Sequence, residues 1–217
     1  MIKEIGKGNS VFNNFLAELR DVSIQKDRLR FRRNLERMGE IFAYEISKVL
    51  TYKNTDIETP LGETHMSVMA EQPVLATILR AGLPLHQGML NYFDNAENAF
   101  ISAYRKYDAD EDFVIKLNYV SSPGIQDKVL ILSDPMLATG GSIVASLKGI
   151  FEKGTPKHTH IVCVLASEEG IKTIRKSFSS KKTTIWVGAI DDELTAKAYI
   201  VPGLGDAGDL AYGIKED

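Results

Sequence analysis

Apolar residues recur at spacings of three or four along residues 28–50, which predicts an amphipathic helix. The apolar positions are Phe31, Leu35, Met38, Phe42, Ile46 and Val49. Arginines crowd the opposite face between Arg28 and Arg37. Such a run is usually a solvated helix face, and the sharper alternative is a site for an anion or a partner. We expect the first fifty residues to be helical, followed by a β-hairpin at residues 55–69 with its turn at Pro60, Leu61 and Gly62.

From Pro73 onward, short apolar runs alternate with segments of helical spacing. The apolar runs predict strands at 73–79, 99–104, 113–120, 128–133, 160–166 and 183–190. The segments between them predict helices at 83–93, 140–151 and 169–178, the second capped by Gly154. This alternation predicts an α/β fold with a mostly parallel central sheet flanked by helices, an N-terminal helical segment and a β-hairpin arm. We expect one domain over residues 1–217.

The candidate chemistry lies where the strand at 128–133 gives way to the next helix. Asp134 follows the strand, and Thr139, Gly140, Gly141 and Ser142 open the helix. A helix N-terminus offers unpaired N–H groups to an anion, and glycines let the backbone approach it closely. A carboxylate would repel phosphate but suits ribose hydroxyls, so the pattern is typical of a pentose-5-phosphate site. An ordinary strand–loop–helix crossover with a capping threonine fits the same spacing.

Composition narrows the class of protein. The chain has 217 residues, 44% of them hydrophobic, and a net charge of −3, which is ordinary for a globular protein and gives no basic field for nucleic acid. The single cysteine, Cys163, excludes an intramolecular disulfide and fits a reducing compartment. The first residues lack the apolar core of a signal peptide, and no stretch is long enough to span a membrane. We expect a soluble, cytoplasmic protein.

Other motifs are weaker. No P-loop pattern occurs, and the GLGDAG string at residues 203–208 follows Pro202 too near the end of the sequence for a nucleotide-binding βαβ unit. We expect His158 and His160 to flank a strand rather than bind metal, and Cys163 to lie in the core.

Four strings in order resemble the uracil phosphoribosyltransferases, a family of type I phosphoribosyltransferases. LSDPMLATGGS at residues 132–142 resembles the loop that binds 5-phosphoribosyl diphosphate (PRPP), and ILRAGL at 78–83 resembles the diphosphate loop. Tyr104-Arg105 is similar to the mobile arginine segment, and YIVPGLGDAGD at 199–209 to the uracil-binding tail. Residues 166–170 and Leu210 depart from the family's pattern, and we expect these departures not to touch the binding strings.

The resemblance implies a set of site residues. Asp206 and Arg105 would be catalytic. The PRPP-binding residues would be Arg80, Arg105, Asp134, Pro135, Met136, Leu137, Ala138, Thr139, Gly140, Gly141, Ser142 and Asp206. The uracil-binding residues would be Ile200, Gly205, Asp206 and Ala207.

The implied reaction transfers the phosphoribosyl group of PRPP to uracil, giving UMP and diphosphate. The resemblance implies Mg²⁺ bound through the diphosphate, with no metal site of the protein's own. The net charge and the lack of a membrane-length apolar stretch predict no nucleic-acid or membrane partner. The resemblance also implies a homo-oligomer, a dimer or larger, and makes GTP a candidate effector. A nucleotide-sensing regulatory or nucleic-acid-binding protein on the same fold remains the alternative, and a relative acting on another base is a third option.

Overall fold

The computed structural model describes residues 1–107 and 113–215, and for 104–107 and 113–116 only the backbone is described. The strands of the main sheet are β1 (Ile2–Glu4), β4 (Val74–Leu79), β5 (Glu97–Tyr107), β6 (Phe113–Ser121), β7 (Val129–Ser133), β8 (Met136–Leu137), β9 (His158–Ser167) and β10 (Thr183–Asp191). Their order is β1-β10-β9-β7-β4-β5-β6, with β8 also beside β9. All these pairs are parallel except β5 with β6, which confirms the predicted fold class.

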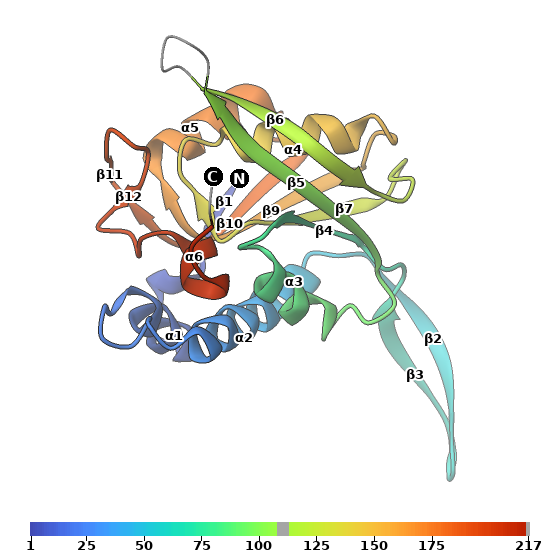
Figure 1. Cartoon of the computed structure of the whole chain (residues 1–217). Coiled ribbons are helices and arrows are strands. Elements are labelled where there is room, and N and C mark those ends of the chain that lie inside the picture. Colours follow the sequence, from blue (N-terminus) through green and yellow to red (C-terminus); the bar gives the residue numbers. More distant parts are fainter. Residues whose placement is uncertain (108–112, 216–217) are drawn as a thin grey trace.

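Helices cover both faces of the sheet (Figure 1). One face carries α1 (Val11–Arg20), α2 (Arg28–Ser47) and α3 (Leu83–Leu90), and the other carries α4 (Gly141–Phe151) and α5 (Glu168–Ser177). Successive strand residues serve opposite faces, because side chains alternate along a strand. Leu75 lies in the core under the first three helices, whereas Val74 and Ala76 lie in the core under α4 and α5. A sheet covered on both faces explains the continuous apolar runs.

The N-terminal prediction was partly wrong. Residues 2–4 form strand β1 at the edge of the sheet, and Ile5–Lys7 form the short 3-10 helix η1. Strand β1 has only three residues and no alternation that could be recognised in the sequence. Gly154 was also a wrong prediction, because α4 ends at Phe151 with Glu152 as its cap. The helix expected at 28–50 is confirmed as α2, with Asp27 accepting a hydrogen bond from the N–H of Arg30.

The predicted hairpin is present as β2 (Tyr52–Thr59) and β3 (Gly62–Met69), joined through Pro60 and Leu61. It projects away from the body of the protein (Figure 1). The side chain of Leu61 at its tip is fully exposed. No helix in the described residues is both long enough and apolar enough to cross a membrane.

Helices α2 and α3 pack backbone against backbone. A Cβ atom placed on Gly88 would lie 1.9 Å from the carbonyl oxygen of Glu36, and one on Gly39 would lie 2.2 Å from that of Leu85. Neither contact leaves room for a methyl group. This packing matters for the site because α3 directly follows the Arg80–Gly82 loop and fixes its direction.

Replacing Gly88 with alanine should therefore destabilise the protein. Alanine favours a helix by about 1 kcal/mol over glycine, but overpacking against a backbone costs roughly 1–3 kcal/mol or more. Urea denaturation should show a lower free energy of unfolding. Gly124→Ala is the matched control, because a Cβ at Gly124 would meet nothing within 4 Å. Equal stabilities of the two variants would contradict the close helix packing.

Candidate active site

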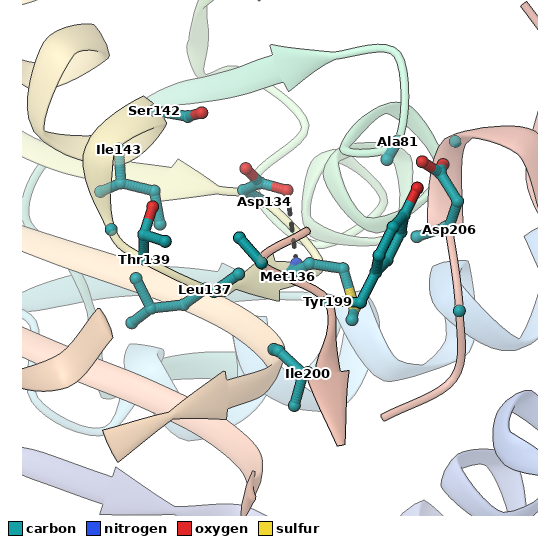
Figure 2. A pocket seen from close by; sticks show the side chains of 16 residues that line it. Ala81, Asp134, Met136, Leu137, Thr139, Ser142, Ile143, Tyr199, Ile200 and Asp206 are labelled. Atoms are coloured by element: carbon teal, nitrogen blue, oxygen red, sulfur yellow. Dashed lines mark hydrogen bonds between the residues drawn. The ribbon is translucent and has the colours of Figure 1, made fainter. Parts of the chain in front are cut away.

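A cavity lies at the carboxyl end of the parallel strands, where α/β sheets bind their ligands. Its wall is built by the loop after β7, the start of α4 and the C-terminal tail (Figure 2). In Figure 2, Thr139 and Ser142 lie on one side, the tail residues Tyr199 and Asp206 on the other, and Asp134 between them. The complete lining is Ala81, Asp134, Met136, Leu137, Ala138, Thr139, Gly140, Ser142, Ile143, Ala198, Tyr199, Ile200, Gly205, Asp206, Ala207 and Gly208.

The loop after β7 turns into α4 through a glycine that a larger residue could not replace without strain. Gly140 has φ +85, in the left-handed region that favours glycine, and is the N-cap of α4. The hydroxyl of Thr139 accepts a hydrogen bond from the N–H of Gly141 at 3.4 Å. Ser142 and Ile143, in the first turn of α4, line the cavity, where the helix terminus carries partial positive charge.

Helix α5 supports this loop from behind. The hydroxyl of Ser167 donates to the carbonyl oxygen of Ala138 at 2.6 Å and accepts from the N–H of Gly170 at 2.9 Å. A Cβ on Gly170 would lie 2.4 Å from the same carbonyl oxygen, so only glycine allows this approach. The expectation that the departure at residues 166–170 does not touch the binding strings was wrong, because this segment contacts the loop directly.

Asp134 is the carboxylate at the centre of the cavity wall. Burial raises its pKa to about 7, although the N–H of Met136, which donates to its Oδ1 at 3.3 Å, lowers it in part. A half-buried carboxyl of this kind gains when a ligand supplies hydroxyl donors, since these stabilise the charged form. Its position therefore suits a polyhydroxylated ligand such as a sugar.

The C-terminal tail forms the opposite wall. Strand β12 (Ile200–Val201) pairs with β11 (Glu193–Leu194), and the chain then turns into the short helix α6 (Ala207–Tyr212). Asp206 caps α6, its side chain accepting from the N–H of Asp209 at 2.9 Å. The GLGDAG string is thus a turn before a six-residue helix, not the opening of a βαβ unit.

The two arginines of the sequence prediction are placed differently from the loop residues. Arg80 is not on the cavity wall; its guanidinium forms an ion pair with Asp209 at 3.0 Å and donates to the carbonyl of Gly213 at 3.2 Å. Arg105 lies in β5 opposite Ile115, and its side chain lies outside the described residues. Pro135, in the loop, and Gly141, the first residue of α4, do not line the cavity.

Some lining residues were not named from the sequence. They are Ala81, Ile143, Ala198, Tyr199 and Gly208. Tyr199 and Gly208 lie inside the tail string and Ala81 inside ILRAGL, so the motifs themselves contained the signal. Nothing in the sequence pattern marks Ala198 or the first-turn residue Ile143 as part of a site.

Two histidines lie in a strand of the main sheet. His158 and His160 lie within β9, which corrects the prediction that they flank a strand. The Nδ1 atom of His160 accepts from the indole N–H of Trp186 at 3.0 Å, and burial lowers the pKa of His160 to about 3. Cys163 is fully buried, as predicted. Among the described residues, no group of three or more metal-binding side chains occurs.

The raised pKa of Asp134 predicts that the stability of the protein depends on pH. The folded state holds this proton more tightly than the unfolded chain, so the stability linked to Asp134 is complete below about pH 4 and is lost as the pH rises through about 7. Asp134→Asn, which cannot ionise, should be more stable than the wild type at pH 8 and nearly equal to it near pH 4.

Urea denaturation across this pH range measures the difference in free energy of unfolding. Asp94→Asn is the control, because Asp94 is exposed and outside the cavity. If the stability gain of Asp134→Asn did not change with pH, the pKa of Asp134 would not be raised in the folded state.

Comparison with known proteins agrees with the site. A model of the uracil phosphoribosyltransferase family matches residues 8–214. A curated uracil phosphoribosyltransferase of Porphyromonas gingivalis is 56% identical over 211 residues, covering 97% of each chain. One of Pyrococcus furiosus is 39% identical over 201 residues, covering 91% of this chain and 84% of the relative. The solved structure of the AQ2163 protein from Aquifex aeolicus has a TM-score of 0.87 at 29% identity, covering 99% of both chains.

Three findings agree with one another. They are the fold, the cavity between the loop before α4 and the glycine-rich tail, and a family match over nearly the whole sequence. This chain belongs to the uracil phosphoribosyltransferase family.

Proposed function

We propose that the protein transfers the 5-phosphoribosyl group of PRPP to uracil, giving UMP and diphosphate. The observation that carries this proposal is the two-sided cavity. One wall offers a helix N-terminus and a carboxylate, and the other offers a glycine-rich backbone. A phosphorylated sugar and a flat base with alternating hydrogen-bonding groups are the two ligand halves that such walls suit.

The loop side would bind the sugar phosphate. The 5-phosphate would take hydrogen bonds from the first N–H groups of α4 and from the hydroxyls of Thr139 and Ser142. The ribose hydroxyls would donate to Asp134. Pro135, Met136, Leu137 and Ala138 form the connection that sets this spacing, and Gly140 and Gly141 let the backbone approach the phosphate.

The diphosphate would be bound by Arg80 and Arg105. Guanidinium groups stay charged and bind phosphate oxygens in pairs, which stabilises the leaving group as the bond to the sugar breaks. Arg80 already pairs with Asp209 of the tail, so a diphosphate would share or replace this carboxylate partner. The pair links the diphosphate loop to the wall that would read the base.

The tail would bind uracil. Ile200, Gly205 and Ala207 lie on the cavity wall and offer backbone C=O and N–H groups to the acceptor–donor–acceptor edge of O2, N3 and O4. In the reaction, the C1–O bond to diphosphate breaks and uracil N1 forms a bond to C1 from the opposite face. As this bond forms, the N1 proton would pass to the carboxylate of Asp206, which lines the cavity. The rate would come from positioning and from leaving-group stabilisation.

Mg²⁺ enters the proposal as part of the PRPP complex. This cation usually binds through one or two carboxylates together with substrate phosphates. The cavity wall carries the carboxylates of Asp134 and Asp206, a donor set that fits a cation brought in by diphosphate. These two residues would be its protein-side partners, and bound Mg²⁺ supplies positive charge that stabilises the leaving diphosphate.

Three expectations from the sequence complete the proposal. The protein would form a homo-oligomer (a dimer or a larger assembly), GTP would be an effector, and the location would be cytoplasmic. The family resemblance supports the assembly and the effector, and the projecting hairpin with its exposed tip offers a surface to a second copy. The cytoplasmic location rests on the single cysteine and on first residues that lack the apolar core of a signal peptide.

The activity test is UMP formation from labelled uracil with and without PRPP and Mg²⁺. UMP should form only when PRPP is present, and cytosine and orotate should be poor substrates. Cytosine places an amino donor where uracil has O4, and one mismatched buried donor costs about 1–3 kcal/mol. The carboxylate of orotate would be repelled by the carboxylate of Asp206 on the cavity wall. Comparable rates with cytosine would mean that the tail does not read the base, and RNA binding without UMP formation would favour a regulatory protein.

Substitution of Ser167 should weaken the binding of PRPP and leave the binding of uracil nearly unchanged. Ser167→Ala removes the hydrogen bond that holds the Ala138 carbonyl and the N-cap of α5, so the KM for PRPP should rise about tenfold while the KM for uracil stays nearly constant. Ser167→Thr keeps the hydroxyl and should restore much of the loss.

Ser10→Ala is the matched control, because Ser10 also accepts from a helix N–H, that of Phe12 at the start of α1, away from the loop. It should lower stability slightly and leave both KM values unchanged. An unchanged KM for PRPP in Ser167→Ala would remove α5 from the description of the loop.

A further inference from the structure

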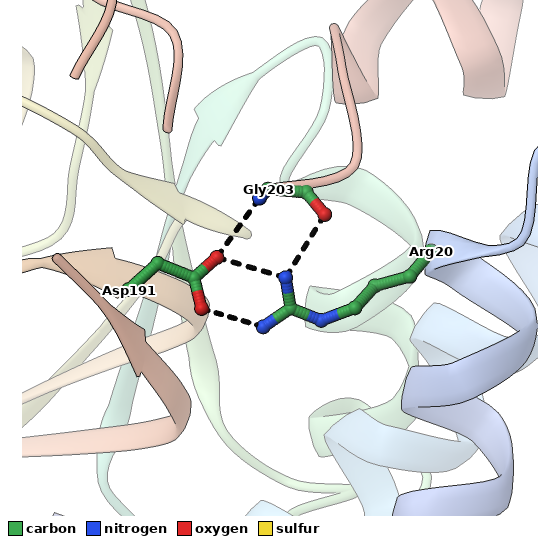
Figure 3. Close-up of polar contacts among 3 residues, drawn as sticks. All are labelled: Arg20, Asp191 and Gly203. Carbon is green, nitrogen blue, oxygen red and sulfur yellow. Dashed lines mark hydrogen bonds and ion pairs between the residues drawn. The ribbon is translucent and has the colours of Figure 1, made fainter. Parts of the chain in front are cut away.

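Three residues far apart in the sequence form a closed set of hydrogen bonds beneath the tail (Figure 3). Arg20, the last residue of α1, donates through Nη1 and Nη2 to Asp191 Oδ2 and Oδ1 at 2.8 and 2.7 Å. Nη1 also donates to the carbonyl oxygen of Gly203 at 2.9 Å, and the N–H of Gly203 donates to Asp191 Oδ2 at 2.9 Å. We call Arg20 and Asp191 the tail clamp.

The clamp occupies both main-chain polar groups of Gly203, and the turn there has little freedom. Gly203 has φ +56, and a Cβ on it would lie 2.0 Å from the carbonyl oxygen of Ile200. Ile200 and Leu204, on either side of the turn, are buried in the core. The position of Gly203 thus determines how Ile200 before it and Gly205 after it reach the cavity wall.

The clamp is a partly buried charged pair, with Arg20 25% exposed. Asp191 is only 7% exposed. Burial opposes its ionisation, but the hydrogen bonds from Arg20 and Gly203 outweigh burial and hold the pKa of Asp191 below its usual value. Buried ion pairs are often replaceable by apolar residues without loss of stability, so stability alone does not account for a pair at this position. The bidentate contact fixes the orientation of the Arg20 guanidinium relative to the Asp191 carboxylate.

A second side chain from the N-terminal helices holds the next tail residue. The side-chain amide of Gln25, in the connection from α1 to α2, donates to the carbonyl oxygen of Leu204 at 3.2 Å. The same amide donates to the carbonyl of Leu19 at 2.8 Å, which ties it to the end of α1. Arg20, Gln25 and Asp191 are all absent from the cavity wall, so they act on it only through the tail backbone.

We infer that the tail clamp is a positioning device for the base: Arg20 and Asp191 set where the backbone of residues 205–207 meets uracil, and so govern base affinity and base selectivity. This inference rests on the proposed function. It gives the N-terminal helices a role in the site although none of their side chains lines the cavity. The PRPP loop has its own support from α5, so disturbing the clamp should raise the KM for uracil more than the KM for PRPP, which the tail would contact only at Asp206.

The test uses Arg20→Lys, which keeps the charge and loses the two-pronged contact, and Gln25→Ala as a milder second variant. In Arg20→Lys the KM for uracil should rise at least about fivefold while the KM for PRPP stays within about twofold. The ratio of kcat/KM for uracil over cytosine should fall, since a displaced backbone discriminates less. Gln25→Ala should shift the same quantities in the same direction.

Arg30→Ala is the matched control. Arg30 makes an equally well-formed two-pronged pair with Glu18, at 2.8 and 2.6 Å, which joins α1 to α2 without touching the tail. This variant should leave both KM values and the base selectivity unchanged. Equal rises in the uracil and PRPP KM values of Arg20→Lys, or no change in either, would overturn the inference.

Amide hydrogen exchange tests the clamp independently of catalysis. In the wild type the N–H of Gly203 is bonded to Asp191 and should exchange slowly. Arg20→Lys should speed exchange at Gly203 and at 205–207, while α1 and α4 stay protected and Arg30→Ala matches the wild type. Absence of UMP formation by the wild type would refute the proposed function; unchanged tail exchange in Arg20→Lys would refute the clamp, whatever the activity.

Discussion

The architecture of the site depends on one partly buried contact, the pairing of Asp191 with Arg20 and with the backbone of Gly203 (Figure 3). It joins the end of strand β10, the end of α1 and the C-terminal tail at a single point. Arg20 and Gly203 lie near opposite ends of the sequence, and the hydrogen bond between them connects the end of α1 to the C-terminal tail. Because Oδ2 of Asp191 accepts from both Arg20 and the N–H of Gly203, the contact orients the tail relative to the sheet.

The two cavity walls have separate supports. The loop before α4 rests on α5 through Ser167 and Gly170, whereas the tail rests on the N-terminal helices. Arg80, in the loop between β4 and α3, contacts the tail through its ion pair with Asp209. Asp134 sits between the walls with its pKa raised to about 7, a local instability that a sugar ligand would relieve. This is the exchange of stability for function that binding sites commonly show.

The sequence predicted most of the sheet and the loop, because these depend on local patterns. The run at 128–133 followed by Asp134 and two glycines was sufficient to place a strand, a loop and a helix start. Strand β1 was missed because three residues carry no periodicity, and its place depends on pairing with residues 185–187. The partners of Ser167 and Arg80 could not be predicted either, since both contacts join segments distant in sequence. Tail residues were found through their resemblance to a family, not through any physical signal in the string.

The most direct test of the two-walled site is a crystal structure of the protein with bound UMP. The account predicts the 5-phosphate at the N-terminus of α4 between Thr139 and Ser142, the ribose hydroxyls on Asp134, and the base against the backbone of residues 205–207. UMP bound with its phosphate at the tail, or outside the cavity between these walls, would contradict it.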